Sequence, residues 1–165
     1  MRTRALLLIF LLGSSLFFFS QNLFSAEGRE ILRNGGFNDP AGEYTYWSLR
    51  AGGMGKFSTI PPDNPLDNKV LQVDVRQTSA KPWAMELLQL LSNDVEKGTT
   101  LYISFDYKLS EGYCFHFYWQ VEQAPWPKLL SLKITEPADT WRTIQVAVPI
   151  HEDYFAERTA FSFHF

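Results

Sequence analysis

The stretch that decides the fold is Leu101–Lys108, which reads LYISFDYK. Its odd-numbered positions are apolar or aromatic, and the residues between them include the polar Ser104, Asp106 and Lys108. Successive side chains of a β-strand point to opposite faces, so this period of two predicts a strand with one face in a core and the other in solvent. Around it, from Pro82 to Pro149, no nucleophile elbow, phosphate loop or paired metal-ligand motif appears.

The same alternation recurs along the chain, with polar turns between the segments. The further segments that show it are 69–76, 113–121, 130–134, 144–148 and 161–165. The stretch Ala84–Leu91 suits a helix by composition, but Pro82 before it and the strands around it favour a buried strand. Short alternating strands with few helical patterns predict an all-β fold, an antiparallel β-sandwich of the jelly-roll type.

The last alternating segment ends with the chain itself. Phe165 has no turn or polar tail after it. A jelly roll would usually need one more strand, so we expect this sandwich to lack its last strand. Two explanations stay open: a truncated gene product or a module cut from a longer enzyme, and a natural C-terminus that is short.

The N-terminus has the three-part layout of a secretory signal peptide. Met1–Arg4 is basic, Ala5–Phe19 is almost wholly apolar, and Ser20–Ala26 is more polar and ends in small residues. The apolar part is shorter than the roughly 20 residues of a membrane span. We therefore expect residues 1–26 to be removed and residues 27–165 to form one secreted or periplasmic domain. The alternative is an uncleaved N-terminal anchor.

Charge and aromatic content limit the kinds of partner that the protein is expected to bind. The formal net charge of the whole chain is −3, and the leader carries two arginines, so the processed chain is more acidic. An acidic balance argues against nucleic acid or an anionic membrane and suits a neutral ligand. Aromatic residues recur beside polar ones, which is the combination that sugars require, because their C–H faces stack on rings and their hydroxyls need hydrogen bonds. We expect a monomer, and the single cysteine, Cys114, excludes an intrachain disulfide.

Three motifs resemble a known family. Asn34-Gly35-Gly36-Phe37 is similar to the opening of the CenC-type carbohydrate-binding modules, and Lys97–Phe105 and Thr140–Thr143 are similar to two of their later motifs. The resemblance implies a galactose-binding-like jelly roll that binds a polysaccharide. These modules accompany xylanases and other glucan hydrolases.

The order of four further segments resembles the N-terminal modules of bacterial endo-1,4-β-xylanases. The segments are 82–87, 125–128, 141–149 and 153–165. The resemblance covers most of residues 31–165. It implies a module that binds a plant-type polysaccharide, xylan or β-glucan, and that comes from the front of a secreted glycoside hydrolase whose catalytic domain is absent here. By itself the chain would not be an enzyme.

One departure concerns a metal. Asn38 stands where the opening motif of the family usually has an acidic residue, which weakens the case for the structural calcium site that the resemblance implies. We expect no cofactor.

The alternation places several polar residues on faces away from the core. If their strands are neighbours in one sheet, these residues converge on its concave side, where carboxylates and amides would bind hydroxyls and Tyr118 would stack on a sugar. Trp47, Trp119 and Trp141 are expected in the core, and Trp83 is expected to pack rather than to form a platform. The candidate carbohydrate-binding residues are Glu86, Asp106, His116, Tyr118, Gln120 and Trp126.

Three other interpretations stay open at this point. Glu86 and Asp106 could be the acid/base pair of a glycosidase, and His116 and His164 with Asp106 could hold a metal, but no motif or short ligand spacing supports either. The polar face could also be plain solvated surface on a structural or protein-interaction domain of an exported bacterial protein.

Overall fold

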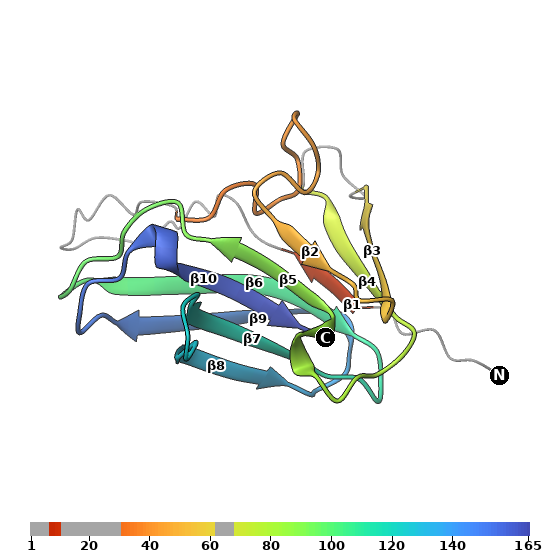
Figure 1. Cartoon of the computed structure of the whole chain (residues 1–165). Coiled ribbons are helices and arrows are strands. Elements are labelled where there is room, and N and C mark those ends of the chain that lie inside the picture. The colour runs from red at the N-terminus through yellow and green to blue at the C-terminus, as the bar shows by residue number, and fades with distance from the viewer. Residues whose placement is uncertain (1–6, 11–30, 62–67) are drawn as a thin grey trace.

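The computed structural model describes residues 7–10, 31–61 and 68–165 of the chain (Figure 1). Within these residues the strands form two five-stranded sheets whose neighbouring strands all run antiparallel. The strands are β1 (Leu7–Phe10), β2 (Ser48–Arg50), β3 (Gly55–Ile60), β4 (Val70–Val75), β5 (Glu86–Leu90), β6 (Thr100–Leu109), β7 (Phe115–Val121), β8 (Lys128–Ile134), β9 (Ala138–Pro149) and β10 (Thr159–His164). Two short 3₁₀ turns accompany them, η1 (Pro82–Ala84) and η2 (Ala156–Arg158).

The two sheets have different strand sets. Sheet A has the order β3-β4-β1-β6-β9, and sheet B has the order β2-β5-β10-β7-β8. Strands far apart in the sequence are neighbours in both sheets, as β10 between β5 and β7 shows (Figure 1). The predicted all-β antiparallel sandwich is therefore confirmed, and the ambiguous segment 84–91 does contain a strand, β5.

Aromatic rings fill the core between the sheets. Phe105 of β6 packs with Phe117 of β7 and Phe163 of β10, at centroid distances of 5.2 and 5.4 Å. All three side chains are nearly inaccessible to solvent. Such contacts between aromatic rings stabilise beyond the burial of area alone. The period-two pattern of the sequence thus identified the core faces of these strands correctly.

The five tryptophans divide between core and surface. Trp47 and Trp119 are buried as predicted, but Trp83 and Trp141 are 51% and 45% exposed, so their assignment to packed positions is wrong. Trp83 lies in η1, where the parity of a strand does not apply. In β9 the inward residues are the even-numbered ones from Ile144 onward, and the pleat carries Trp141 to the other face.

Strand β1 lies within the predicted leader. It pairs with both β4 and β6 and so occupies an inner position of sheet A (Figure 1). The expected cleavage point near Ala26 lies outside the described residues, and removal of the leader stays a prediction. In the described part of the chain no helix is long and apolar enough to cross a membrane.

Candidate functional site

The outer face of sheet B gathers polar side chains from five neighbouring strands. Register fixes which of them lie side by side, because paired residues of adjacent strands point to the same face. Glu86 pairs with His164, and His164 pairs with His116. One step along, Leu88, Ser162 and Tyr118 are aligned, and then Leu90, Ala160 and Gln120. The edge strands extend these rows with Arg50 and Ser48 of β2 and with Lys133, Ser131 and Lys128 of β8.

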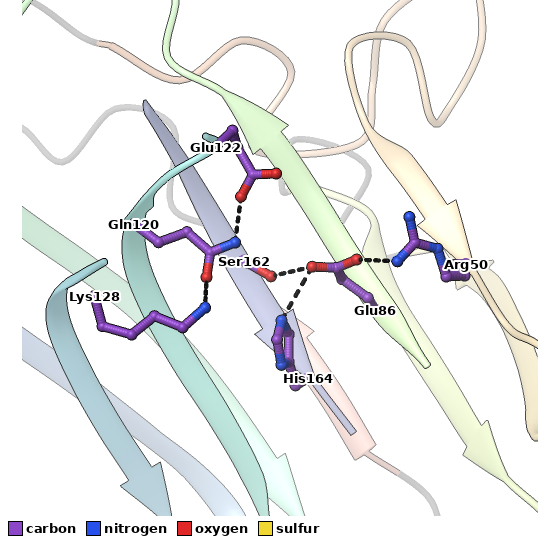
Figure 2. A network of polar contacts seen from close by, with 7 residues as sticks. All are labelled: Arg50, Glu86, Gln120, Glu122, Lys128, Ser162 and His164. Carbon is purple, nitrogen blue, oxygen red and sulfur yellow. Dashed lines mark hydrogen bonds and ion pairs between the residues drawn. The ribbon is translucent and has the colours of Figure 1, made fainter. Parts of the chain in front are cut away.

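Glu86 is the centre of one polar network (Figure 2). Its Oε1 accepts a hydrogen bond from Ser162 Oγ at 2.7 Å and lies 3.0 Å from His164 Nε2, while its Oε2 lies 3.1 Å from Arg50 Nη1. A carboxylate can only accept, so His164 carries its proton on Nε2. Burial alone would raise the pKa of Glu86, but these hydrogen bonds and the nearby positive charges outweigh it, and the pKa lies below its ordinary value.

A second network surrounds Gln120. Its amide nitrogen donates to Glu122 and its amide oxygen accepts from Lys128 (Figure 2). The Lys128 ammonium also lies 4.3 Å from the centroid of the Tyr118 ring, which is a cation–π contact. Partial burial lowers the pKa of Lys128 despite the attraction of Glu122 and Glu86.

Tyr118 is enclosed on several sides. Besides Lys128, the His164 ring meets it edge-on at 4.7 Å, and the His116 ring lies nearly parallel to it at 5.7 Å. Burial raises the pKa of the Tyr118 hydroxyl and also lowers the pKa of His116, with Lys133 and His164 adding to the latter shift. Tyr118 therefore joins the two networks and is less open as a stacking platform than the sequence suggested.

The structure brings four predicted candidates together and separates a fifth. Glu86, His116, Tyr118 and Gln120 share the outer face of sheet B. Asp106 does not join them, since it lies on β6 of sheet A and accepts a hydrogen bond from Thr143. The expected convergence is wrong for Asp106 because β6 and β7, although consecutive, belong to different sheets. Glu86 and Asp106 thus cannot act as a pair on one glycosidic bond.

Two exposed indoles lie outside the rows. Trp126, the sixth candidate, is 56% exposed in the loop between β7 and β8, and Trp83 is 51% exposed in η1. The loop and η1 lie at opposite ends of sheet B (Figure 1). The sequence did not indicate Trp83 as an exposed ring, nor Arg50 and Lys128 as network members. For Trp83 the available signal was Pro82 directly before it, because proline favours the start of a 3₁₀ turn such as η1.

No metal cluster is found in the described residues: none of their His, Cys, Asp and Glu side chains gather in groups of three or more that could hold an ion. At the opening motif, Asn38 Nδ2 donates to Asn68 Oδ1 at 2.9 Å, and Asn38 Oδ1 accepts from the backbone of Lys69. The amide that replaces the family's acidic residue is thus used within the protein.

Comparison with known proteins supports the fold. No known protein family matches the chain by sequence, and no curated protein does either. A solved structure described as "CBM4 structure and function", a carbohydrate-binding module, matches with a TM-score of 0.50 and 18% identity over 72% of this chain and 74% of that one. At this identity the likeness shows the fold, a β-sandwich like that of the module. The CenC-type and xylanase resemblances rest on the sequence motifs alone.

Proposed function

We propose that the outer face of sheet B binds a carbohydrate chain without chemically changing it. The observation that carries this proposal is the pair of polar networks whose buried centres are Glu86 and Gln120. They hold the more accessible Arg50, Lys128 and Glu122 in fixed positions on one face. Sugar hydroxyls both donate and accept, so a face with both kinds of group suits them. The sandwich shared with a carbohydrate-binding module adds support.

The exposed rings would supply the apolar contacts. Because Tyr118 already contacts Lys128, His116 and His164, we assign stacking to Trp83 and Trp126 at the two ends of the sheet. A chain that runs along the strands would meet polar groups in the middle and an indole at each end. Few contacts per sugar and the loss of hydration of its hydroxyls keep such affinity modest.

The finer proposal follows from the sequence resemblance. It names a soluble plant-type polysaccharide, xylan or mixed-linkage β-glucan rather than crystalline cellulose, and an origin at the front of a secreted glycoside hydrolase. Asp106 lies on the other sheet, so the Glu86–Asp106 acid/base pair forms no part of this proposal.

Affinity electrophoresis on soluble xylan and β-glucan tests the proposal. The parent should be retarded, and Trp83→Ala and Trp126→Ala should each weaken retardation. Trp141→Ala is the matched control, since Trp141 is similarly exposed but belongs to sheet A. Equal retardation of all three variants would contradict the assignment of the rings, with circular dichroism as the check on folding.

One observation favours a second candidate, a structural or protein-interaction domain. The Glu86 carboxylate already has three partners within the protein, so part of the polar face is satisfied without a ligand. If no glycan retards a folded parent protein, this interpretation replaces the first.

A further inference from the structure

The position of β1 in sheet A conflicts with the expected fate of its sequence. Leu7–Phe10 pairs with β4 over three residues and with β6 over four. No other strand separates β4 from β6. Yet the segment belongs to the basic–apolar–small leader that the sequence predicts to be removed on export.

Removal of β1 would leave two strand edges facing each other across a gap one strand wide. The edge of β4 at Leu71–Val73 and the edge of β6 at Asp106–Leu109 would lose their backbone partners together. Unpaired backbone groups in the interior of a sheet are costly, and an open edge binds another strand readily. The fold therefore needs an occupant at this position after processing.

The flanking residues define the chemistry of that occupant. At the register positions of Leu7 and Ile9 the neighbours are the buried Val73 and Leu109, and Leu71 and Tyr107. At the position of Leu8 the neighbours are the half-buried Gln72 and Lys108. The gap thus alternates between apolar and polar surroundings, whereas the leader is apolar at every one of these positions.

Asp74 gives an independent indication of the same preference. It follows Val73 on β4 and lies on the polar face with Gln72. Its Oδ2 pairs with Arg76, but its Oδ1 is buried and has no hydrogen-bond partner among the described residues. A polar residue of an added strand on this face could donate to that oxygen, which an apolar strand cannot do.

We propose that the position between β4 and β6 is a strand-acceptor site, and that Leu7–Phe10 occupies it only until the leader is removed. Its occupant is a strand from another polypeptide, an extended peptide in which apolar residues point to the core and polar residues point outward. Main-chain hydrogen bonds to both edges would supply affinity, and the alternation would supply selectivity.

Two matched peptides test the selectivity. The alternating peptide spans residues 5–12 with Leu8→Gln and Phe10→Thr, which keeps Leu7 and Ile9. The inverse peptide carries Leu7→Gln and Ile9→Thr, which keeps Leu8 and Phe10. Each peptide carries one Gln and one Thr, and the two peptides place these polar residues on opposite faces.

The protein for the test is the full chain with a protease site placed after Ala26. It is cut in the presence of excess peptide, so that the leader can exchange. We expect the alternating peptide to bind in place of the leader with an affinity at least about tenfold higher than that of the inverse peptide. Burial of two apolar side chains contributes more free energy than a tenfold change in affinity requires. Hydrogen exchange should show protection of the amides of 71–73 and 106–109 with the alternating peptide.

Three results would overturn the proposal. The first is equal replacement by both peptides, or unfolding of the cut chain in the presence of the alternating peptide. The second is a cut chain that keeps its protection after the leader has been washed away, which would mean that no occupant is needed. The third is a dimer of the cut chain that excludes both peptides, which would make a second copy the occupant. The uncut full chain is the reference for protection in each case.

Discussion

His164 on β10 and Glu86 on β5 face each other across neighbouring strands, with 3.0 Å between Nε2 and Oε1 and with both side chains more than nine-tenths buried. They are 78 residues apart in sequence. The same Glu86 oxygen accepts from Ser162, two residues before His164 on the same strand. The contact therefore fixes β5 against β10 and places one polar network on the outer face of sheet B.

Loss of the Glu86 charge should destabilise the domain. Glu86→Gln keeps the volume but weakens the hydrogen bonds to Ser162 and His164 and removes the ion pair with Arg50. We expect a loss of about 1–3 kcal/mol in the free energy of unfolding, measured by urea denaturation at neutral pH. Glu111→Gln, at an exposed turn, is the control and should change stability by less than about 0.5 kcal/mol. Equal effects of the two changes would mean that the network contributes nothing.

The same carboxylate predicts a loss of stability in acid. The folded pKa of Glu86 lies below its ordinary value of 4.5, so the stabilisation is present above pH 4.5 and is lost as the pH falls through the folded pKa. The urea midpoint should fall in this pH range when it is measured between neutral pH and acid. In Glu86→Gln this fall with pH should be smaller. If the urea midpoint of the variant falls with pH as much as that of the parent, other carboxyls are responsible for the acid sensitivity.

His116 should cause a separate loss of stability at higher pH. Burial first, and then the charges of Lys133 and His164, lower its folded pKa from 6.5. Its neutral form is favoured in the folded state, so stability begins to fall as the pH drops below 6.5 and the loss is complete below the folded pKa. His116→Gln should remove this loss of stability, while the loss below pH 4.5 that Glu86 causes remains. NMR titration of the imidazole gives the folded pKa directly and should place it below 6.5.

The tryptophans should separate stability from binding. Trp119 is 1% exposed and meets the Tyr154 ring edge-on at 4.9 Å, so Trp119→Ala should cost about 3–5 kcal/mol. Trp119→Phe should cost less, because the indole nitrogen has no hydrogen-bond partner in the described residues. Trp126→Ala should leave the thermal midpoint nearly unchanged. A large loss from Trp126→Ala would show that this ring packs rather than serves a ligand.

Tyr118 should act through its neighbours. Tyr118→Phe retains the ring that Lys128 and His164 contact and should keep glycan retardation, whereas Tyr118→Ala should weaken it clearly without unfolding the domain. Asp106→Asn, on the other sheet, is the binding control and should have no effect. Weakened retardation by Asp106→Asn in a folded protein would relocate the site to sheet A.

Period-two alternation was sufficient to predict the class of fold and the core faces of β6 and β7. The inward side of each strand can be predicted from the residues of that strand alone, because the pleat depends only on local backbone geometry. It was therefore possible to predict that Phe105, Phe117 and Trp119 would be buried. It was equally possible to predict that His116, Tyr118 and Gln120 would point together, because all three lie on one strand.

Which strands become neighbours is decided over the whole chain, and local pattern does not contain it. Asp106 has the same alternation as Tyr118 but faces outward from the other sheet. Arg50 reaches Glu86 only because β2 pairs with β5. Trp83 is exposed because a 3₁₀ turn interrupts the strand parity that would have buried it.

The sequence by itself determined the alternation of strands such as β6 and β7, their inward faces and the absence of an intrachain disulfide. Only the tertiary structure decided that Glu86, Ser162 and His164 form one network, that Asp106 lies apart from it, and that Leu7–Phe10 pairs between β4 and β6. The physical reason is that a strand's face depends on neighbouring residues in the sequence, whereas its partners depend on burial and backbone pairing between segments far apart in the chain.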